Sequence, residues 1–595
     1  MKHLMTGNEA VARGFYEQGG LYASAYPGTP STEILEECAQ HKDVLTAEWA
    51  PNEKVALESA IGASMAGVRS LAAMKHVGVN VAADPLFTIG YTGVNGGLIL
   101  ISADDPGCHS SQNEQDNRYY AKFAKVPCLE PSDSQEAKDM IKTAYEISEA
   151  FDTLCFYRMT TRVCHSKSLV EWGEREEVEA KTYEKNVAKY VANPGNAKRR
   201  HPIIEERLIK LEEYSNASPL NFVEDNGSDI GIITAGVSYN YAKEVFTDSV
   251  NYLKIGMSYP LPMQKIKDFA ATVKTLYVIE ELEPFMEEQI KAAGIQCIGK
   301  DLIPRVGELN PDIIDAAINH KEREHVAVPE DLTVGRPPIL CAGCPHRGFF
   351  YELGKMKTVM VTGDIGCYTL GAAEPLNTID SVICMGASIS MGHGARKAFD
   401  RLGEDKKIVT VIGDSTFLHT GINSLVNSIY NNSKTVNVIL DNRITGMTGH
   451  QQNPGTGFTL QGDIAHQVDF EEVVKALGIK KVKTINPLNL EESKTTLKEF
   501  LAYEEGPSVI ITRYPCALKK YSEQDLDEFG YDRRICQVDE EACRGCRNCI
   551  RTGCPSISFD SETKKASIDP NMCVGCTVCL QSCPFDAIHK VGEKK

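Results

Sequence analysis

The stretch that most constrains the fold of this chain is residues 408–442, where two short apolar runs flank a helical pattern. The first run, Ile408 to Ile412, is rich in β-branched residues and stops at Gly413, which is typical of a buried strand in a parallel sheet. A second strand is expected over Val436 to Leu440. Two strands joined by a helix predict an α/β architecture with parallel sheets. The helix is expected to bury a face formed by Ile422, Leu425, Val426 and Ile429.

Polar side chains follow both of these predicted strands. Asp414 and Ser415 come directly after the first strand, and Asn442 follows the second. Open α/β sheets bind ligands at the carboxyl ends of their strands, so these side chains are expected at one edge. A carboxylate, an amide oxygen and a backbone carbonyl leave Mg²⁺ with open positions for two phosphate oxygens. The sequence therefore predicts a magnesium and diphosphate site.

This pattern resembles the signature of thiamine diphosphate (TPP) enzymes, a Gly-Asp-Gly with an Asn after the next strand. Ser415 departs from the usual third Gly. The resemblance implies Gly413, Asp414, Ser415 and Asn442 as cofactor-binding residues. It also implies the Asp414 and Asn442 side chains and the Ile444 carbonyl as Mg²⁺ ligands. From this stretch alone, an ordinary strand–turn–helix with a chance Gly-Asp is the alternative.

A second motif lies near the N-terminus, where Pro27-Gly28-Thr29-Pro30 makes a rigid loop between an expected strand and a helix starting at Thr32. The phrase YPGTPSTEI resembles the YPITPSS loop of 2-oxoacid:ferredoxin oxidoreductases. That resemblance implies that Thr29 contacts a 2-oxoacid. Standing alone, the loop would be interpreted as a proline-stiffened start of a helix.

An acidic residue at the start of the next predicted helix is the candidate catalytic group. The helix opens at Asn52-Glu53-Lys54 and carries Gly62 at a close-packing point. TPP enzymes use one buried Glu to activate the cofactor, and the resemblance implies Glu53 in that role. Glu58 is the rival, one turn further on. A carboxylate at a helix N-terminus needs no catalytic role, which is the other interpretation.

Two polar loops follow apolar strands between residues 71 and 118 and contain His76 and His109. In relatives these positions line the substrate side of the cofactor, which implies both as candidate substrate-binding residues. A His can bind a carboxylate or move a proton. Either could equally be a loop histidine with no role.

Three loops of the C-terminal half contain cysteines that are far apart in the chain. In a cytosolic enzyme, a lone Cys-x-x-Cys indicates zinc or redox chemistry. Here the loops match positions that hold the proximal [4Fe–4S] cluster in pyruvate:ferredoxin oxidoreductases. The resemblance implies a possible third cluster, with zinc or free thiols as the alternative. Its four ligands would be Cys341, Cys344, Cys367 and Cys516.

Two cysteine runs near the C-terminus are the least ambiguous motif. The second has the spacing of the bacterial ferredoxin run, and the first has one extra residue before its last Cys. In two-cluster ferredoxins the fourth Cys of each run binds the other cluster. This rule assigns Cys543, Cys546, Cys549 and Cys583 to one [4Fe–4S] cluster, and Cys573, Cys576, Cys579 and Cys554 to the other. The extra residue leaves the geometry and nuclearity of the second cluster open, and zinc is the remote alternative.

Composition excludes several classes of partner and supports a reduced compartment. The formal charge of −18 over 595 residues argues against nucleic acid or an anionic membrane surface. No apolar run reaches the length of a membrane span, and the start MKHLMTGNEA has no signal-peptide core. A cytoplasmic protein is therefore expected. Its 20 Cys then indicate metal rather than disulfides, and favour an anaerobic or well-reduced host.

The expected fold is α/β, with several doubly wound parallel-sheet domains and a C-terminal two-cluster ferredoxin domain. In the first domain, a helix is expected over Gly7 to Gly19. In the smaller central domain, strands are expected near Ile230–Thr234, Leu253–Ile255 and Leu276–Ile279, and Glu280, Glu281 and Glu283 at a solvated helix start. The predicted domains are a pyrimidine-binding TPP domain (1–180), a charged connector (181–227), a transketolase C-terminal-like domain (228–325), a diphosphate-binding TPP domain (336–520) and a ferredoxin-type domain (535–595).

Taken together, these motifs resemble the α subunits of indolepyruvate:ferredoxin oxidoreductases over essentially the whole chain. The resemblance implies oxidative decarboxylation of arylpyruvates in aromatic amino acid degradation, with TPP, Mg²⁺ and [4Fe–4S] clusters as cofactors, coenzyme A (CoA) as co-substrate and ferredoxin as acceptor. It also implies a smaller β subunit, in a heterodimer or an (αβ)₂ assembly. Pyruvate, branched-chain 2-oxoacids and 2-oxoglutarate remain alternative substrates. An electron-transfer subunit with a vestigial TPP site is the alternative from another class.

Overall fold

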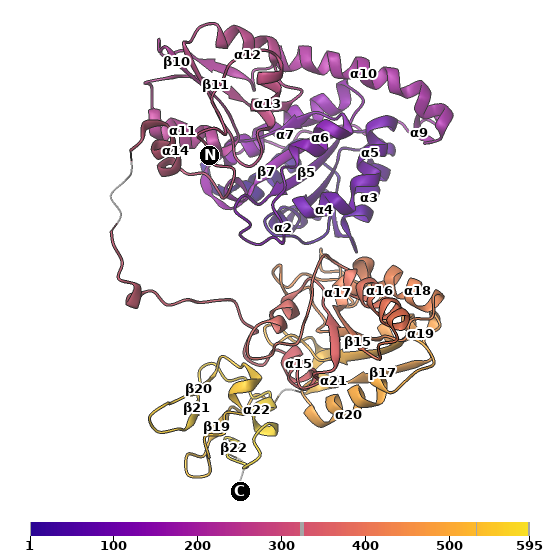
Figure 1. Cartoon of the computed structure of the whole chain (residues 1–595). Coiled ribbons are helices and arrows are strands. Elements are labelled where there is room, and N and C mark those ends of the chain that lie inside the picture. The colour runs from indigo at the N-terminus through magenta and orange to yellow at the C-terminus, as the bar shows by residue number, and fades with distance from the viewer. Residues whose placement is uncertain (1, 322–325, 531, 593–595) are drawn as a thin grey trace. The chain divides into compact units, whose positions relative to one another are not determined.

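The computed structural model describes residues 2–321, 326–530 and 532–592. The chain divides into two compact units, Met1–Ala327 and Val328–Lys595, which are described separately (Figure 1). The limits predicted at residues 1, 325 and 595 lie outside the described residues. Among the helices described, none is both long and apolar enough to cross a membrane.

The first unit is built on a seven-stranded sheet with the order β12-β6-β7-β5-β4-β2-β3. Its pairs are parallel except for β12 with β6, which is antiparallel. The central strands β4, β5 and β7 are entirely buried, as continuous apolar runs in a two-sided parallel sheet require. The strands are β2 (Tyr22–Ala25), β3 (Thr46–Trp49), β4 (Ser70–Lys75), β5 (Leu98–Asp104), β6 (Cys128–Leu129), β7 (Cys155–Thr160) and β12 (Met257–Tyr259).

Helices join these strands, and three of them begin close to the predicted positions at residues 7, 32 and 53. β1 (Lys2–Thr6) and β8 (Lys167–Glu171) form a separate two-stranded antiparallel sheet. The helices are α1 (Gly7–Glu17), α2 (Thr32–Cys38), α3 (Glu53–Met65), α4 (His76–Val81), α5 (Ala83–Thr92), α6 (Arg118–Ala124), α7 (Ser134–Ala150) and α8 (Thr161–His165).

The segment predicted as an exposed connector contains the short helix α9 (Val187–Tyr190) and the 24-residue helix α10 (Pro194–Ala217). Asn193 caps α10, and Pro194 stands in its first turn, where a missing N–H costs nothing. The buried Arg207 donates to the Gly90 and Asp152 carbonyl oxygens at 2.6 and 2.8 Å. The connector is therefore fastened to the first sheet domain along α10.

A second sheet follows, with the order β13-β10-β11-β9. Three of its strands match predicted strands, and the fourth, β9, falls inside the segment predicted as a connector. The elements are β9 (Phe222–Glu224), β10 (Ile230–Ala235), α11 (Val237–Phe246), β11 (Asn251–Ile255), α12 (Met263–Ala270), β13 (Thr275–Ile279), α13 (Phe285–Ala292) and α14 (Pro311–Asn319).

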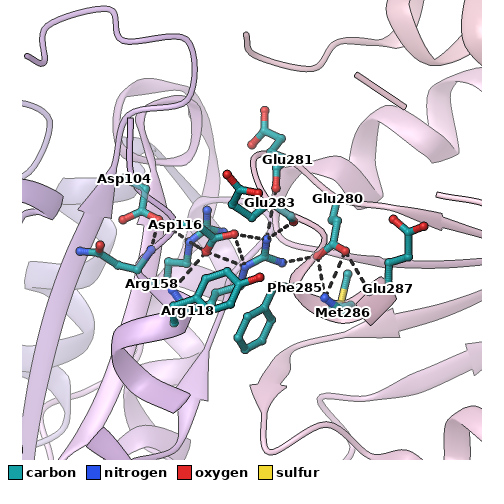
Figure 2. Close-up of polar contacts among 12 residues, drawn as sticks. Asp104, Asp116, Arg118, Arg158, Glu280, Glu281, Glu283, Phe285, Met286 and Glu287 are labelled. Atoms are coloured by element: carbon teal, nitrogen blue, oxygen red, sulfur yellow. Dashed lines mark hydrogen bonds and ion pairs between the residues drawn. The ribbon is translucent and has the colours of Figure 1, made fainter. Parts of the chain in front are cut away.

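The prediction that Glu280 and Glu281 are solvated is wrong. Both are buried, and Figure 2 shows them beside an arginine of the first sheet domain. Arg118 Nη1 donates to Glu280 Oε2 at 2.7 Å, and Arg118 Nη2 donates to the Glu281 carbonyl oxygen at 3.1 Å. A buried carboxylate needs such a partner, and this one comes from a distant part of the chain. Glu283, with 54% of its side chain exposed, does face solvent.

The second unit contains a five-stranded, wholly parallel sheet with the order β14-β15-β16-β18-β17. The strands predicted within 408–412 and 436–440 are β15 and β16. Val426, expected on the buried face of the helix between them, is 44% exposed. The elements are α15 (His346–Leu353), β14 (Val359–Thr362), α16 (Ala387–Leu402), β15 (Lys407–Gly413), α18 (Ile422–Tyr430), β16 (Val436–Asp441), α19 (Phe470–Ala476), β17 (Lys481–Ile485), α20 (Leu490–Leu501), β18 (Ser508–Arg513) and α21 (Glu523–Phe529).

The C-terminal part of the second unit is a small domain of two antiparallel strand pairs and one short helix. Its core is formed largely by cysteines and short apolar side chains. The elements are β19 (Cys536–Val538), paired with β22 (Ile588–Lys590), β20 (Ile557–Phe559), paired with β21 (Ala566–Ile568), and α22 (Val578–Gln581).

Candidate functional site

Asp414 lies at the carboxyl edge of the second unit's sheet, directly after β15. It is 3% exposed, and its Oδ1 accepts the Ser415 N–H at 2.8 Å, while Oδ2 accepts no hydrogen bond among the described residues. Burial, and then the Asp441 charge, raise the pKa of Asp414 to about 8. A divalent cation would stabilise a carboxylate in such a dry environment. The residues therefore fit a magnesium site.

The other predicted ligands lie on the neighbouring strand end. β15 and β16 pair in parallel with Gly413 opposite Leu440, so the residues after both strands reach the same edge. Asn442 is buried, and its Oδ1 accepts the Ile444 N–H at 3.2 Å. Gly413 has no room for a side chain, because a Cβ there would lie 2.8 Å from the Tyr368 ring.

Asp364, to which the sequence analysis gave no role, lies at the same edge after β14. It is fully buried, and burial raises its pKa to about 6. Its carboxylate accepts the N–H groups of Gly386 and Ser388 at 2.8 and 2.9 Å, which fixes the start of α16. The signal was present, because Gly-Asp ends the apolar run before Asp364 as it does before Asp414.

In the first unit, the structure separates Glu53 from its rival Glu58. Asn52 caps α3 by accepting the Val55 N–H at 2.9 Å, and Glu53 is the first residue of that helix. Glu53 is 5% exposed, whereas 45% of the Glu58 side chain is exposed. A Cβ at Gly78 of α4 would lie 2.7 Å from Glu53 Oε1. Gly78 is therefore what allows α4 to approach the buried carboxylate.

The predicted substrate residues occupy different environments in the first unit. Thr29 is half-buried, and its loop is held by Asn8, which donates to the Pro30 carbonyl oxygen at 2.6 Å. His76 is fully buried, with Nε2 3.2 Å from the Asn113 carbonyl oxygen. His109 is 47% exposed at the side chain and pairs with Glu308 at 3.2 Å. His76 is thus a buried support of its loop, and His109 is accessible.

Lys75, at the carboxyl end of β4 in the first unit, was assigned no function from the sequence. It ends β4, next to His76, and its Nζ donates to the Ser110 carbonyl oxygen at 2.7 Å. Burial lowers the pKa of Lys75 to about 8, although the Asp105 charge opposes that shift. Its identity was visible in the sequence, but its burial was not.

The four cysteines of the three loops in the second unit lie close enough for their charges to interact. Burial raises the pKa of Cys344 to about 12, and the charges of Cys516 and Cys367 add to that rise. Burial likewise raises the pKa of Cys367 to about 11, and the charges of Cys516 and Cys341 add to it. Four mutually destabilising thiolates are a site that a cationic iron cluster would stabilise. We call Cys341, Cys344, Cys367 and Cys516 the loop set.

The loop set adjoins the predicted magnesium site. The Cys516 N–H donates to the Asn442 carbonyl oxygen at 3.0 Å. A Cβ added to Gly446, two residues beyond Ile444, would lie 3.8 Å from Cys367 Sγ. One loop therefore carries a predicted metal ligand, bonds to the backbone of Cys516 and passes close to the thiol of Cys367.

In the C-terminal domain, the first predicted cluster has a cavity of its own. Among its lining residues are Cys543, Cys546, Cys549 and Cys583, together with apolar side chains such as Phe559 and Ile588. Three of these cysteines come from the first run and one from the second, as the crossed assignment requires. Arg544 and Arg547 also line the cavity.

At the second predicted cluster site, burial and then the Cys554 charge raise the pKa of the Cys576 thiol to about 11, so Cys554 and Cys576 lie close enough for their charges to interact. In the part of the chain that the structure describes, no group of three His, Cys, Asp or Glu side chains is arranged to hold a single metal ion. Cluster cysteines bind four different irons and do not converge on one atom. We call the eight cysteines of both predicted clusters the run set.

The loop set and the run set meet within the second unit. Gly343, between Cys341 and Cys344, packs on Val574, between Cys573 and Cys576, and a Cβ at Gly343 would lie 2.1 Å from Val574 Cγ2. The buried Arg347 donates to the Cys341 and Thr552 carbonyl oxygens, both at 2.9 Å. The predicted cluster of Cys573, Cys576 and Cys579 is therefore the one whose loop touches the loop set.

Three family descriptions match the chain, and full-length relatives accompany them. The descriptions are "Pyruvate flavodoxin/ferredoxin oxidoreductase, thiamine diP-bdg" at residues 14–221, "Thiamine pyrophosphate enzyme, C-terminal TPP binding domain" at 364–512 and "4Fe-4S binding domain" at 566–589. The chain is 43% identical to "Indolepyruvate oxidoreductase subunit IorA" of Pyrococcus horikoshii, over 100% of this chain and 97% of the relative. The chain belongs to the IorA family. The IorA protein of Archaeoglobus fulgidus is 41% identical over 99% of this chain and 97% of its own length.

Outside the IorA family, "Ketoisovalerate oxidoreductase subunit VorB" of Methanothermobacter marburgensis is 23% identical over 51% of this chain and 93% of that relative. Membership of the IorA family makes the chain a TPP-dependent 2-oxoacid:ferredoxin oxidoreductase. It confirms the family and the fold class predicted from the sequence, with TPP and a [4Fe–4S] domain as cofactor elements. The individual ligand residues, the Mg²⁺ and the number of clusters stay predictions.

Proposed function

We propose that this chain is the catalytic subunit of an enzyme that decarboxylates arylpyruvates, such as indolepyruvate, to aryl-acetyl-CoA and CO₂ while reducing ferredoxin. The observation that carries the proposal is the hydrogen bond from Cys516 N–H to the Asn442 carbonyl oxygen. It places a set of thiols beside the cofactor's metal loop, and a decarboxylase without an electron acceptor has no use for such thiols. The aryl preference rests on the names of the IorA relatives.

The cofactor site needs two groups of residues. The Asp414 and Asn442 side chains with the Ile444 carbonyl hold Mg²⁺, whose open positions take the diphosphate. Bound TPP supplies the chemistry that breaks the bond to CO₂. Glu53 holds the proton that activates the cofactor, and its burial against Gly78 keeps water from that carboxylate.

Substrate binding and electron removal fall to other residues. Thr29 and the accessible His109 contact the 2-oxoacid, and the buried His76 supports their side of the site. In order from the cofactor, the loop set would hold one cluster, Cys573, Cys576, Cys579 and Cys554 a second, and Cys543, Cys546, Cys549 and Cys583 a third, and these clusters would supply one-electron transfer. This order follows from the contact between Gly343 and Val574.

We further propose the assembly in which this chemistry occurs. A smaller β subunit completes the enzyme as a heterodimer or an (αβ)₂ assembly in the cytoplasm. CoA accepts the acyl group, and ferredoxin collects the electrons. Clusters in series suit an acceptor that takes one electron at a time.

A viologen-reduction assay tests the proposal. Purified chain, with and without its β subunit, is given aryl, branched and short 2-oxoacids with and without CoA. We expect the highest kcat/KM with indolepyruvate or phenylpyruvate and strict dependence on CoA. Preference for pyruvate, 2-oxoglutarate or a branched substrate would overturn the aryl assignment. Protein that binds no TPP would instead support an electron-transfer subunit with a vestigial site.

A further inference from the structure

A fifth cysteine, Cys536, lies at the second predicted cluster although it belongs to neither run. It is the first residue of β19 and is 2% exposed. Its backbone N–H donates to Cys573 Sγ at 3.3 Å. Its side chain packs in the same buried cluster as those of Cys573 and Cys579. Cys536 therefore lies against one ligand that the second run contributes to this cluster and shares a core with another.

Cys554, the fourth ligand expected at that cluster, is less closely engaged. Its Sγ lies 3.0 Å from the Ser556 hydroxyl oxygen, and its interaction with the set is with Cys576. It also comes from the run with the extra residue before the last Cys. Cys554 and Cys536 are thus two candidates for the fourth position.

The position of Cys536 is set by the fold of the domain. β19 pairs antiparallel with β22, with Cys536 opposite Lys590, and this pairing closes the domain. A small buried apolar residue would satisfy the packing alone, since a free Cys behaves as a small hydrophobe. Packing, however, does not require a thiol in the same core as two other thiols of a ligand set.

We propose that Cys536 is an alternate ligand of the second [4Fe–4S] cluster and can replace Cys554 as its fourth thiolate. The proposal rests on the ligand set given under the proposed function. In the exchange, the Cys536 thiol releases its proton to solvent and its thiolate binds the iron that the Cys554 thiolate leaves. Cys554 then takes up a proton, so the iron oxidation states do not change.

The test compares Cys554→Ala, Cys536→Ala and the double variant in full-length protein purified without oxygen. Iron content, acid-labile sulfide and the electron paramagnetic resonance (EPR) spectrum after dithionite reduction are measured. We expect both single variants to keep the iron of the unaltered chain. The Cys554→Ala variant should show a shifted EPR signal for one cluster. The double variant should lose about four irons, one cubane.

Two controls keep the outcomes separable. Cys546→Ala removes a ligand of the first cluster, for which no fifth thiol lies among the lining residues of its cavity, and should lose about four irons by itself. Circular dichroism and the remaining cluster's EPR signal report whether each variant is folded. Loss of the second cluster from Cys554→Ala, or its retention in the double variant, would overturn the proposed ligand exchange but leave the ligand set of the proposed function standing. Absence of this cluster from the unaltered chain would overturn the ligand set as well.

Discussion

The loop set and the run set of the second unit are built in opposite ways. The run set comes from residues 543–583, where short spacings alone bring the thiols together. The loop set comes from positions between 341 and 516, which only the parallel sheet gathers. The run set is therefore a local module, whereas the loop set shares a backbone contact with the predicted magnesium loop through Cys516 and Asn442. The first kind of site can be added to many enzymes; the second is part of one cofactor site.

The largest effect is expected from a variant that loses the cofactor but keeps the iron bound by the run set. Asp414→Ala should release Mg²⁺ and TPP, because the buried carboxylate is the proposed anchor of the metal. Activity should fall at least ~100-fold, since even outer partners of a metal are worth 10–100-fold in affinity. TPP is measured by thiochrome fluorescence and iron by colorimetry, and the run set should keep its iron.

Asp405→Ala is the matched control for this variant, because 85% of the Asp405 side chain is exposed. It should bind TPP normally. Stoichiometric TPP in Asp414→Ala would show that the metal assignment is wrong. Loss of iron from the loop set as well would show that its loops depend on bound Mg²⁺. The run set should keep its iron without Mg²⁺.

The second prediction concerns the catalytic carboxylate. Glu53→Gln should keep TPP bound but lower kcat by about 10²–10⁴-fold, the usual contribution of a positioned acid or base. Glu58→Gln, at the surface, should have near-normal kcat. The reverse pattern in steady-state viologen reduction would move the role to Glu58.

The third prediction separates the two thiol sets directly. Cys344→Ala should lose about four irons, as should Cys546→Ala, but from different sets. Substrate should still bleach the visible absorption of Cys546→Ala, because the loop set accepts electrons first. In Cys344→Ala that bleaching should slow sharply. Cys108→Ala, an exposed cysteine of the first unit, is the control and should keep all its iron.

A fourth and smaller effect is expected where the two sets touch. Gly343 has a φ of +69°, and a Cβ there would clash with Val574. Gly343→Ala should cost about 1–3 kcal/mol of stability, through the overpacked contact and the left-handed backbone. Electron transfer to the run set should slow, while TPP binding is unchanged. Val574→Ala in the same chain should restore part of the stability in thermal unfolding, and no restoration would argue against the contact.

Much of the fold could be predicted because its signals are local. The apolar runs 408–412 and 436–440 gave the strands β15 and β16, and the helix starts at Gly7, Thr32 and Glu53 followed from spacing and capping residues. The crossed assignment of the run set also needed only spacing, and the cavity lined by Cys543, Cys546, Cys549 and Cys583 agrees with it. Such features depend on neighbours a few residues away.

Features that depend on distant partners were not accessible in this way. Glu280 and Glu281 follow a strand as surface acids would, yet both are buried, where Arg118 donates to the Glu280 carboxylate and the Leu309 N–H donates to the Glu281 carboxylate. Cys536 stands outside both runs, and only the pairing of β19 with β22 brings its backbone N–H to Cys573 Sγ. No local pattern could have shown either contact.

By itself, the sequence determined the chemistry that the chain carries: the acids at two strand ends, the Glu at a helix start and the cysteines at cluster spacing. Tertiary structure alone decided which of these groups meet, how deeply each is buried and which thiols adjoin the metal loop. The physical reason is that spacing along a strand or helix fixes direction and local distance, whereas burial and charge pairing depend on what packs from elsewhere.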